Sequence, residues 1–242
     1  MNTKGTKIQV SNLLIDTVKK DIRNMHLGVY PPQGRVRVAA PTETTDEAIK
    51  LFVLSRMHWI KTQQRKFQDQ ERQTMRQYLP GESHYFLGVR HLLDLVQTDD
   101  RPRIDVPSKK KITMYAAPNT SRVQKEVLFE RFYRSELKEL APTKVKKWQN
   151  ILGVEAREVR IRKMKTKWGT CNAVEGRIWL NLELAKKDTD CIDYVIVHEL
   201  AHLKEKSHTE RFFRLLESAM PDWTQTKKKL NNSTLSYWRW DC

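Results

Sequence analysis

The feature that most constrains this chain is the segment His198-Glu199-Leu200-Ala201-His202, an H-E-x-x-H motif. If the segment is helical, His198 and His202 lie one turn apart on the same face and can point both imidazoles at one metal ion. Glu199 is turned by about 100° from His198, so its carboxylate can reach a water on the ion without binding the ion itself. A zinc ion with one open position needs this division of labour. The motif therefore predicts metal-assisted hydrolysis, with Glu199 as the general base.

The residues around the motif favour a metal site over a chance match. Tyr194-Val195-Ile196-Val197 before it, and Leu200 and Leu203 within and after it, are too apolar for a surface helix. The histidines and the glutamate would then be polar groups on a largely buried element. Such groups need partners, and a metal ion supplies them. We expect Thr189 or Asp190 to cap the start of this helix.

His208 is predicted to be the third metal ligand. A straight helix continued from His202 would carry His208 to the wrong face. The polar stretch 204–206 breaks the helix, and Ser207 followed by Glu210 has the pattern of a capping box. His208 would then be the first residue of a second helix that folds back on the first. The alternative is that His208 is a solvated residue of a first helical turn.

A set of further motifs surrounds these histidines. They are Lys167-Trp168-Gly169-Thr170-Cys171, Ile178-Trp179-Leu180-Asn181, Asp193-Tyr194 directly before the motif helix, Phe212, and Met220-Pro221-Asp222. In this combination the chain resembles the YgjP-like metallopeptidase family, densely from Glu158 to Trp223 and more loosely towards the N-terminus. The resemblance implies a zinc-dependent hydrolase with a SprT-like zincin core. The family usually has Arg-Trp-Gly-Ser-Cys where this chain begins with Lys167, which keeps the charge but lacks the planar guanidinium fork.

Cysteine usage and hydropathy favour a cytoplasmic protein. The 242 residues include only three cysteines, in no disulfide or zinc-finger spacing, which favours a reducing compartment. The first residues contain no apolar signal region. No apolar run approaches the ~20 residues of a membrane span, so we expect no membrane partner. The sequence indicates no oligomeric state.

The basic composition allows two interpretations. Lys and Arg number 45 against 29 Asp and Glu, for a net charge of +16. Such an excess suits a nucleic-acid partner, but it also suits a solvated surface, which the lysine triplets favour because no aromatic residues are interleaved with them. The exception is a dense segment directly before the motif helix, which could line the mouth of its cleft. It contains Arg160, Arg162, Lys163, Lys165 and Lys167.

The overall pattern predicts an α+β fold with no internal repeat. We expect a β-rich N-terminal module over 1–115 with one inserted helix, and a zincin-like domain over 116–242. Periodicity predicts strands at 7–10, 13–18, 22–30, 35–39, 85–96, 111–116, 158–164 and 177–182. It predicts helices at 47–75 and 121–140, the latter interrupted by Pro142 before a helix at 145–152.

The motif leaves three functions open. Hydrolysis of a peptide or amide bond, in a peptide or protein substrate, is the default for one zinc per chain bound by His198, His202 and His208. The same site could hydrolyse a nucleotide or phosphoanhydride bond, which a basic cleft mouth would suit. A nucleic-acid-binding protein with a structural metal would need a fourth protein ligand, and Cys171 and Cys191 lie outside the spacing of the motif.

Overall fold

The computed structural model describes residues 5–30, 34–69, 75–164 and 167–232. They form the predicted α+β fold, divided into two compact units, of which the first ends at Gln73 and the second begins at Thr74. We expected the division between residues 115 and 116. The strands between 83 and 116 belong to the second unit because their buried residues, such as Ile112, share one core with residues of the following helix, such as Phe129.

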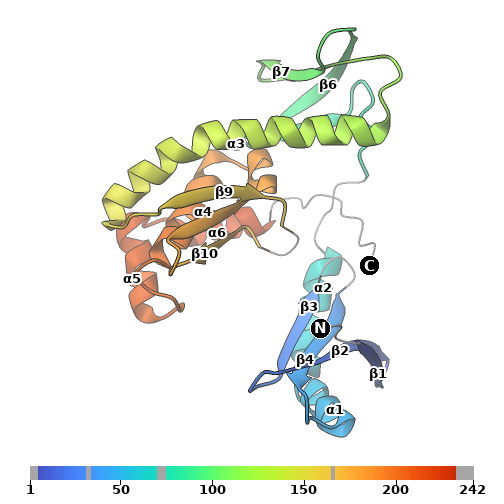
Figure 1. The fold of residues 1–242 in the computed structure, drawn as a ribbon, viewed down its shortest axis with the longest axis vertical. Helices are drawn as coiled ribbons and strands as arrows, with labels where there is room; N and C mark the ends of the chain where they lie inside the picture. Colours follow the sequence, from blue (N-terminus) through green and yellow to red (C-terminus); the bar gives the residue numbers. More distant parts are fainter. Residues whose placement is uncertain (1–4, 31–33, 70–74, 165–166, 233–242) are drawn as a thin grey trace. The chain divides into compact units, whose positions relative to one another are not determined.

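The first unit is a four-stranded sheet packed against two helices (Figure 1). Its strands β1 (Thr6–Val10), β2 (Leu13–Lys20), β3 (His26–Tyr30) and β4 (Arg35–Pro41) have the order β1-β2-β4-β3. The central β2–β4 pair is parallel and the outer pairs are antiparallel. One long helix was predicted here, whereas the structure has α1 (Asp46–Ser55) and α2 (Met57–Asp69). The chain breaks at Arg56, whose N–H turns back to the carbonyls of Val53 and Leu54.

The second unit starts with a sheet of its own. Its strands β5 (Ser83–Phe86), β6 (Val89–Gln97), β7 (Arg103–Ser108) and β8 (Lys111–Ala116) have the order β5-β6-β8-β7. The single strand predicted over 85–96 is wrong, because Leu87 and Gly88 form a hairpin turn with φ of 46° and 81°. Strand β7 was not predicted.

The two sheets repeat one topology. In each, two antiparallel pairs flank a central parallel pair, and the strand order is equivalent. The first hairpin closes at Val10 and Leu13 in one and at Phe86 and Val89 in the other. A helix follows each sheet. Its N-cap, Thr45 or Ser121, lies 35 residues after the residue that ends the first strand, Val10 or Phe86. The expectation of no internal repeat was therefore wrong at the level of structure.

Helix α3 (Arg122–Leu152) is continuous over 31 residues although Pro142 lies inside it. The predicted interruption is wrong because the buried residues Leu137, Ala141, Val145 and Trp148 continue one apolar face across the proline. Their packing offsets the hydrogen bond that a proline in a helix removes. In Figure 1, α3 runs from the second sheet across to the layer that contains β9, α4 and α6.

This last layer contains the H-E-x-x-H motif. The strands β9 (Glu158–Arg162), β10 (Gly169–Asn172) and β11 (Arg177–Asn181) form a sheet of order β10-β11-β9. A 3₁₀ helix η1 (Leu182–Lys186) and the helices α4 (Thr189–Ala201), α5 (Glu210–Ala219) and α6 (Trp223–Asn232) follow. Strand β10 was not predicted. None of the helices in the described part of the chain is long and apolar enough to cross a membrane.

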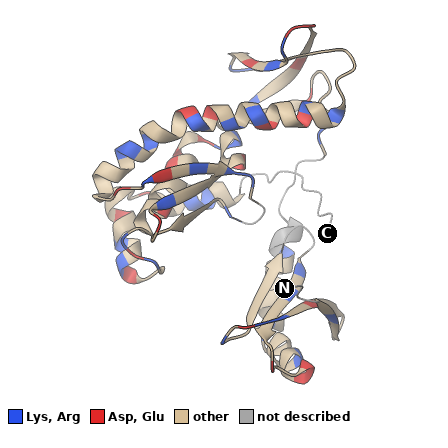
Figure 2. Cartoon of the chain, in the orientation of Figure 1, with Lys and Arg blue, Asp and Glu red and all other residues tan. Residues whose placement is uncertain are grey.

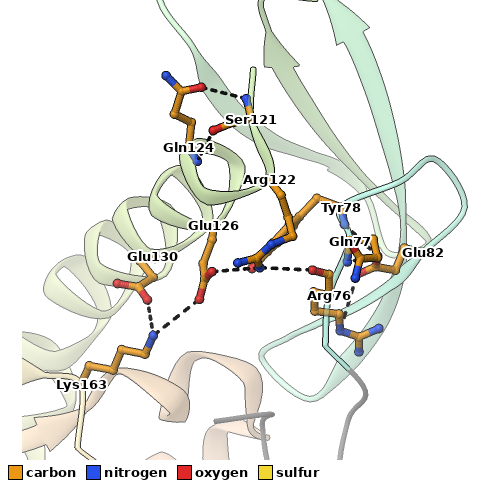
Figure 3. A network of polar contacts seen from close by, with 10 residues as sticks. All are labelled: Arg76, Gln77, Tyr78, Glu82, Ser121, Arg122, Gln124, Glu126, Glu130 and Lys163. Atoms are coloured by element: carbon orange, nitrogen blue, oxygen red, sulfur yellow. Dashed lines mark hydrogen bonds and ion pairs between the residues drawn. The ribbon is translucent and has the colours of Figure 1, made fainter. Parts of the chain in front are cut away.

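Polar contacts fasten α3 at both ends. Near its start, Arg122 Nη1 donates to the carbonyl of Arg76 at 3.5 Å, and Lys163, directly after β9, contacts Glu126 and Glu130 (Figure 3). Further along, Lys144 Nζ and Trp148 Nε1 both donate to the Asp193 carboxylate at 2.7 Å. Because Asp193 lies on α4, these bonds fix the motif helix against α3.

Candidate metal centre and active site

The structure brings the three predicted ligands together. His198 lies in α4 and His202 directly follows it, while His208 lies in the loop before α5. Their ligand nitrogens are all within 4.8 Å of one another, and Nε2 of His198 is 3.1 Å from Nε2 of His208. The three ring centroids are 4.8–5.0 Å apart. The rings therefore surround a single point.

The chain turns towards this point by a route that differs from the prediction. The cap of α5 is Thr209, whose hydroxyl accepts from the N–H of Phe212 at 3.4 Å, so Ser207 and Glu210 do not form the expected capping box. His208 consequently precedes the cap instead of beginning the helix. The N-cap of α4 is Asp188, with no side-chain cap bond, in place of Thr189 or Asp190.

The surroundings favour neutral histidines with a free lone pair. The Glu205 carbonyl lies 3.0 Å from His202 Nδ1, and because a carbonyl only accepts, this contact places the proton on Nδ1 and leaves Nε2 free. Burial lowers the pKa of His198 to about 3, assisted by His202, His208 and Lys227. Burial and His202 also lower the pKa of His208. Neutral imidazole is the form that binds metals.

Phe212 is the common support of the three imidazoles. Its side chain is fully buried, and its ring centroid lies 5.0 Å from that of His198, 4.6 Å from that of His202 and 4.7 Å from that of His208. In the sequence, Phe212 stands out only as part of a motif. Its place as an apolar residue in the first turn of α5, directly after the loop that carries His208, was the available signal.

Glu199 is buried against the backbone of β10. A Cβ on Gly169 would lie 2.6 Å from Glu199 Oε1 and 2.7 Å from its Cγ, so only glycine leaves room for this carboxylate. Burial raises the pKa of Glu199 to about 8, and the ammonium of Lys167 opposes that rise. The Trp168-Gly169 dipeptide thus has a steric role that its sequence alone did not reveal.

Beside the histidines lies a cleft of about 820 Å³. Its walls come from β10 and the residues around it, from α4, from the loop carrying His208, and from α6. Tyr194 lines it and stacks on Trp223, with ring centroids 6.4 Å apart. Strand β10 is an edge strand, because β11 is its only strand partner among the described residues.

Asn181 fixes the segment that enters the cleft before β10. Its side-chain amide donates to the carbonyls of Met164 at 2.9 Å and Lys167 at 2.7 Å. Its Oδ1 accepts from the N–H groups of Met164 and Glu183. Since Asn181 is itself buried, this clamp sets where Lys167 and Trp168 lie.

The basic segment before the motif helix does not line the cleft as a whole. Only Lys167 does so; Lys165 lies outside the described residues. Strand β9, which carries basic positions along its ribbon (Figure 2), lies at the opposite edge of the sheet from β10. Arg160 and Arg162 belong to β9, and their guanidinium carbons are 5.3 and 5.9 Å from the ring centre of Trp179. The expectation that these arginines line the mouth of the cleft is wrong.

The two cysteines among the described residues, Cys171 and Cys191, have raised thiol pKa values. Cys171 lines the cleft, but burial and the nearby Glu199 raise the pKa of its thiol to about 11. Cys191 is buried and its pKa is raised to about 12, chiefly by burial. Both thiols are therefore protonated at neutral pH, which argues against a cysteine nucleophile.

Comparison with known proteins agrees with this geometry. Residues 24–233 match the YgjP-like, metallopeptidase domain family. The chain belongs to this family. It is similar to the crystal structure of the metallopeptidase zymogen of Pyrococcus abyssi abylysin (26% identity, 37% of this chain and 90% of that chain, TM-score 0.35). It is also similar to that of the zymogen of Methanocaldococcus jannaschii jannalysin (23%, 37% and 91%, TM-score 0.34). No curated protein sequence matches the chain significantly.

Family membership confirms the resemblance carried by the motifs. The chain is a metallopeptidase, and its fold places the H-E-x-x-H helix in the wall of a cleft large enough for several substrate residues. Hydrolysis of peptide or protein substrates by a divalent metal is thereby shown at the level of the family.

Proposed function

We propose that this chain is a zinc peptidase in which His198, His202 and His208 hold one zinc ion and Glu199 is the general base. The observation that carries the proposal is the convergence of three imidazoles on one point in the wall of a cleft, with a buried carboxylate beside them. Each of these groups is held by a separate contact of the fold.

The geometry fits zinc. With zinc–nitrogen bonds of about 2.0–2.1 Å, two ligands of a tetrahedral ion lie roughly 3.3 Å apart, and the two Nε2 atoms of His198 and His208 are 3.1 Å apart. Among the described residues, no fourth histidine, cysteine or carboxylate joins this cluster. An open fourth position is typical of catalytic zinc, which when bound acidifies water and polarises a carbonyl group.

The residues of the chain perform the proton transfers. Glu199 accepts a proton from the attacking water and returns it to the leaving amine. Gly169 and the burial of Glu199 hold the carboxylate against β10 and limit its contact with bulk water. Lys167 stabilises the charged form of Glu199.

A peptide fits the cleft better than a nucleotide does. The edge strand β10 lines the cleft, and an extended peptide can add to such an edge through main-chain hydrogen bonds. The lysines in the cleft wall would suit a phosphate as well as a carboxylate, but membership of a metallopeptidase family favours a peptide bond over a phosphoanhydride. A structural metal would need a fourth protein ligand. Nucleic-acid binding stays a prediction from composition. The free thiols of Cys171 and Cys191 support our inference of a cytoplasmic location.

The general-base role is tested by Glu199→Gln, which keeps the shape of the side chain but cannot accept the proton. We expect the rate of peptide hydrolysis to fall by about 10²–10⁴-fold, with zinc content and thermal unfolding nearly unchanged. The control is Glu210→Gln, because Glu210 lies close in sequence but its side chain is 86% exposed. Near wild-type turnover in the Glu199 variant would refute the role.

The third ligand is tested separately by His208→Ala. We expect zinc to be lost on dialysis against a mild chelator that leaves the wild-type protein loaded. Because His208 is exposed, the fold should survive the substitution. If the variant retains zinc as tightly as wild type, His208 is not a ligand.

A further inference from the structure

The charges that line the cleft are of one sign. Apart from the histidines, its charged residues are Lys167, Lys206, Lys227 and the buried Glu199. Because Glu199 is assigned to the reaction, every remaining charge in the wall is a lysine. The lysines come from three places: the segment before β10, the loop before α5, and α6. The positive charge therefore comes from three separate segments of the cleft wall.

These lysines lack acidic partners in the protein. Among the described residues, no carboxylate oxygen lies within ion-pair distance of Lys167, Lys206 or Lys227. Lys229, on the same helix as Lys227, contrasts with them: its Nζ lies 3.0 Å from Asp188 and 2.9 Å from Asp190. The fold thus gives acidic partners to Lys229, which does not line the cleft, whereas the lysines in the wall have none among the described residues; Lys227 Nζ instead lies 5.5 Å from the ring centre of Trp223.

The lysines act electrostatically on the site. Lys167, Lys206 and Lys227 line the same cleft as the three histidines and Glu199. A cleft lined by one sign of charge concentrates ligands of the opposite sign. The wall also supplies the apolar Trp168, Val174 and Leu230, so the cleft offers main-chain, apolar and cationic contacts together.

We propose that the substrates of this cleft are acidic peptides, with Asp or Glu side chains within a few residues of the scissile bond that pair with Lys167, Lys206 and Lys227. This inference rests on the proposed peptidase function. It adds the substrate class, because a carboxylate in the substrate supplies the partner that each lysine lacks within the chain. A peptide with basic residues at the same positions meets only repulsion.

The test uses zinc-loaded full-length protein and three peptides that differ only beside the scissile bond, where they carry Glu, Gln or Lys. We expect kcat/KM to fall in the order Glu, Gln, Lys, with about tenfold or more between the Glu and Lys peptides at low salt. High salt should shrink this ratio because exposed charges are screened. Equal values for the Glu and Lys peptides would overturn the proposal.

Charge-reversal variants identify which lysines cause the preference for acidic peptides. Lys206→Glu and Lys227→Glu should each lower the Glu-to-Lys peptide ratio, and Lys227→Glu should raise kcat/KM for the Lys peptide. Lys228→Glu is the matched control, because Lys228 is exposed on α6 next to Lys227 but does not line the cleft. An equal shift in the Lys228 variant would show a general effect of net charge and would overturn the assignment to the cleft.

A binding measurement separates this inference from the peptidase proposal. Fluorescence anisotropy of the same labelled peptides with the Glu199→Gln protein needs no turnover. Tighter binding of the Glu peptide than of the Lys peptide, weakened by Lys227→Glu, supports the preference for acidic peptides. Failure of the wild-type protein to cleave any peptide would count only against the proposed peptidase function. Tighter binding of a single-stranded oligonucleotide than of the Glu peptide would assign the lysines to a nucleic acid and overturn it.

Discussion

Two regions of this molecule share one topology but differ in what they support. The sheet β1–β4 and the sheet β5–β8 have equivalent strand orders, and each is followed by a capped helix. After β4, the helix breaks at Arg56 and its residues complete a core confined to the first unit. After β8, α3 continues over 31 residues, and its second half packs in the same core as α4.

The first hairpins of the two sheets also differ, because only the turn of the second sheet contacts the elements around the motif helix. In the hairpin of the second sheet, the N–H of Leu87 donates to the Ala185 carbonyl of η1 at 2.8 Å, and Gly88 packs against Asp188, the N-cap of α4. In the first sheet the equivalent turn residues, Ser11 and Asn12, are exposed. One topology thus becomes a support for the active site through a turn and a helix that reach beyond the sheet, with its strand order unchanged.

The strongest test of this comparison is a pair of identical substitutions in the two cores. Ile15 and Ile112 are both fully buried, in central strands of the first and second sheets. Each Ile→Ala change should destabilise its own unit by about 2–5 kcal/mol. Because the two cores contain separate residues, we expect two unfolding transitions in calorimetry, one shifted by each variant.

Only Ile112→Ala should also weaken zinc retention and activity at elevated temperature. The comparison fails if Ile15→Ala lowers activity as much as Ile112→Ala does. It also fails if both variants shift one common transition, since the units would then unfold together.

The sequence predicted the members of the candidate site more fully than the fold. His198, Glu199 and His202 were assigned from spacing alone, because a helix fixes the relation of residues within one turn. The structure brings His208 to the other two histidines, but the predicted capping box is wrong, because the position of His208 depends on the loop around Glu205 and on packing against Phe212. Such contacts between separate elements produce no periodic pattern in the sequence.

The elements that the sequence missed were set by tertiary context. Pro142 was expected to break a helix that packing on both sides keeps continuous. Strand β10 is four residues long, too short for an alternation to be recognised. The repeated topology escaped detection because equivalent positions carry different chemistry, for example Ile8 paired with Ile15 in one hairpin and His84 paired with His91 in the other.

The hairpin turns offer a second, smaller test. Gly88 has a φ of 81°, and a Cβ there would lie 1.9 Å from Asp188 Oδ1 and 2.9 Å from Asp188 Cα. Gly88→Ala should destabilise the second unit by about 2–3 kcal/mol through backbone strain and displacement of the start of α4. Asn12→Ala, in the exposed equivalent turn, should change stability by less than about 0.5 kcal/mol. Chemical denaturation of both variants measures the difference, and equal effects would mean that the docked turn is not a support.

His84, which pairs with His91 in the second sheet, predicts that the second unit is more sensitive to acid than the first. His84 is buried, with its ring stacked on Phe129 at 4.4 Å, and burial lowers its pKa to about 3, although Glu82 Oε1 lies 3.1 Å from its Nε2. Because the folded pKa is below the unfolded value of about 6.5, the unfolded chain binds the proton first. This contribution to stability is complete above pH 6.5 and is lost as the pH falls towards 3.

We therefore expect the second unit to lose about 2 kcal/mol between pH 7 and pH 5 through His84. His84→Ile, which installs the residue type of Ile8, should reduce that loss, and the comparison is made at saturating zinc so that the ligand histidines affect both proteins alike. The described histidines of the first unit, His26 and His58, are exposed, so its transition should vary less with pH. An unchanged pH profile in the variant would assign the acid sensitivity to other groups.

The smallest expected effect concerns the equivalent helix caps. Ser121 forms a capping box with Gln124, accepting from its N–H at 3.3 Å while Gln124 Oε1 accepts from the Ser121 N–H at 2.8 Å. Thr45 accepts only from the Ala48 N–H, at 3.2 Å. Each change to alanine should cost about 1 kcal/mol, in its own unit. Ser121→Ala should leave peptidase activity unchanged, because the α3 residues that hold α4, Lys144 and Trp148, lie several turns beyond the cap. Loss of activity in this variant would show that the site depends on the whole length of α3, which would extend the support beyond the contacts with Asp193.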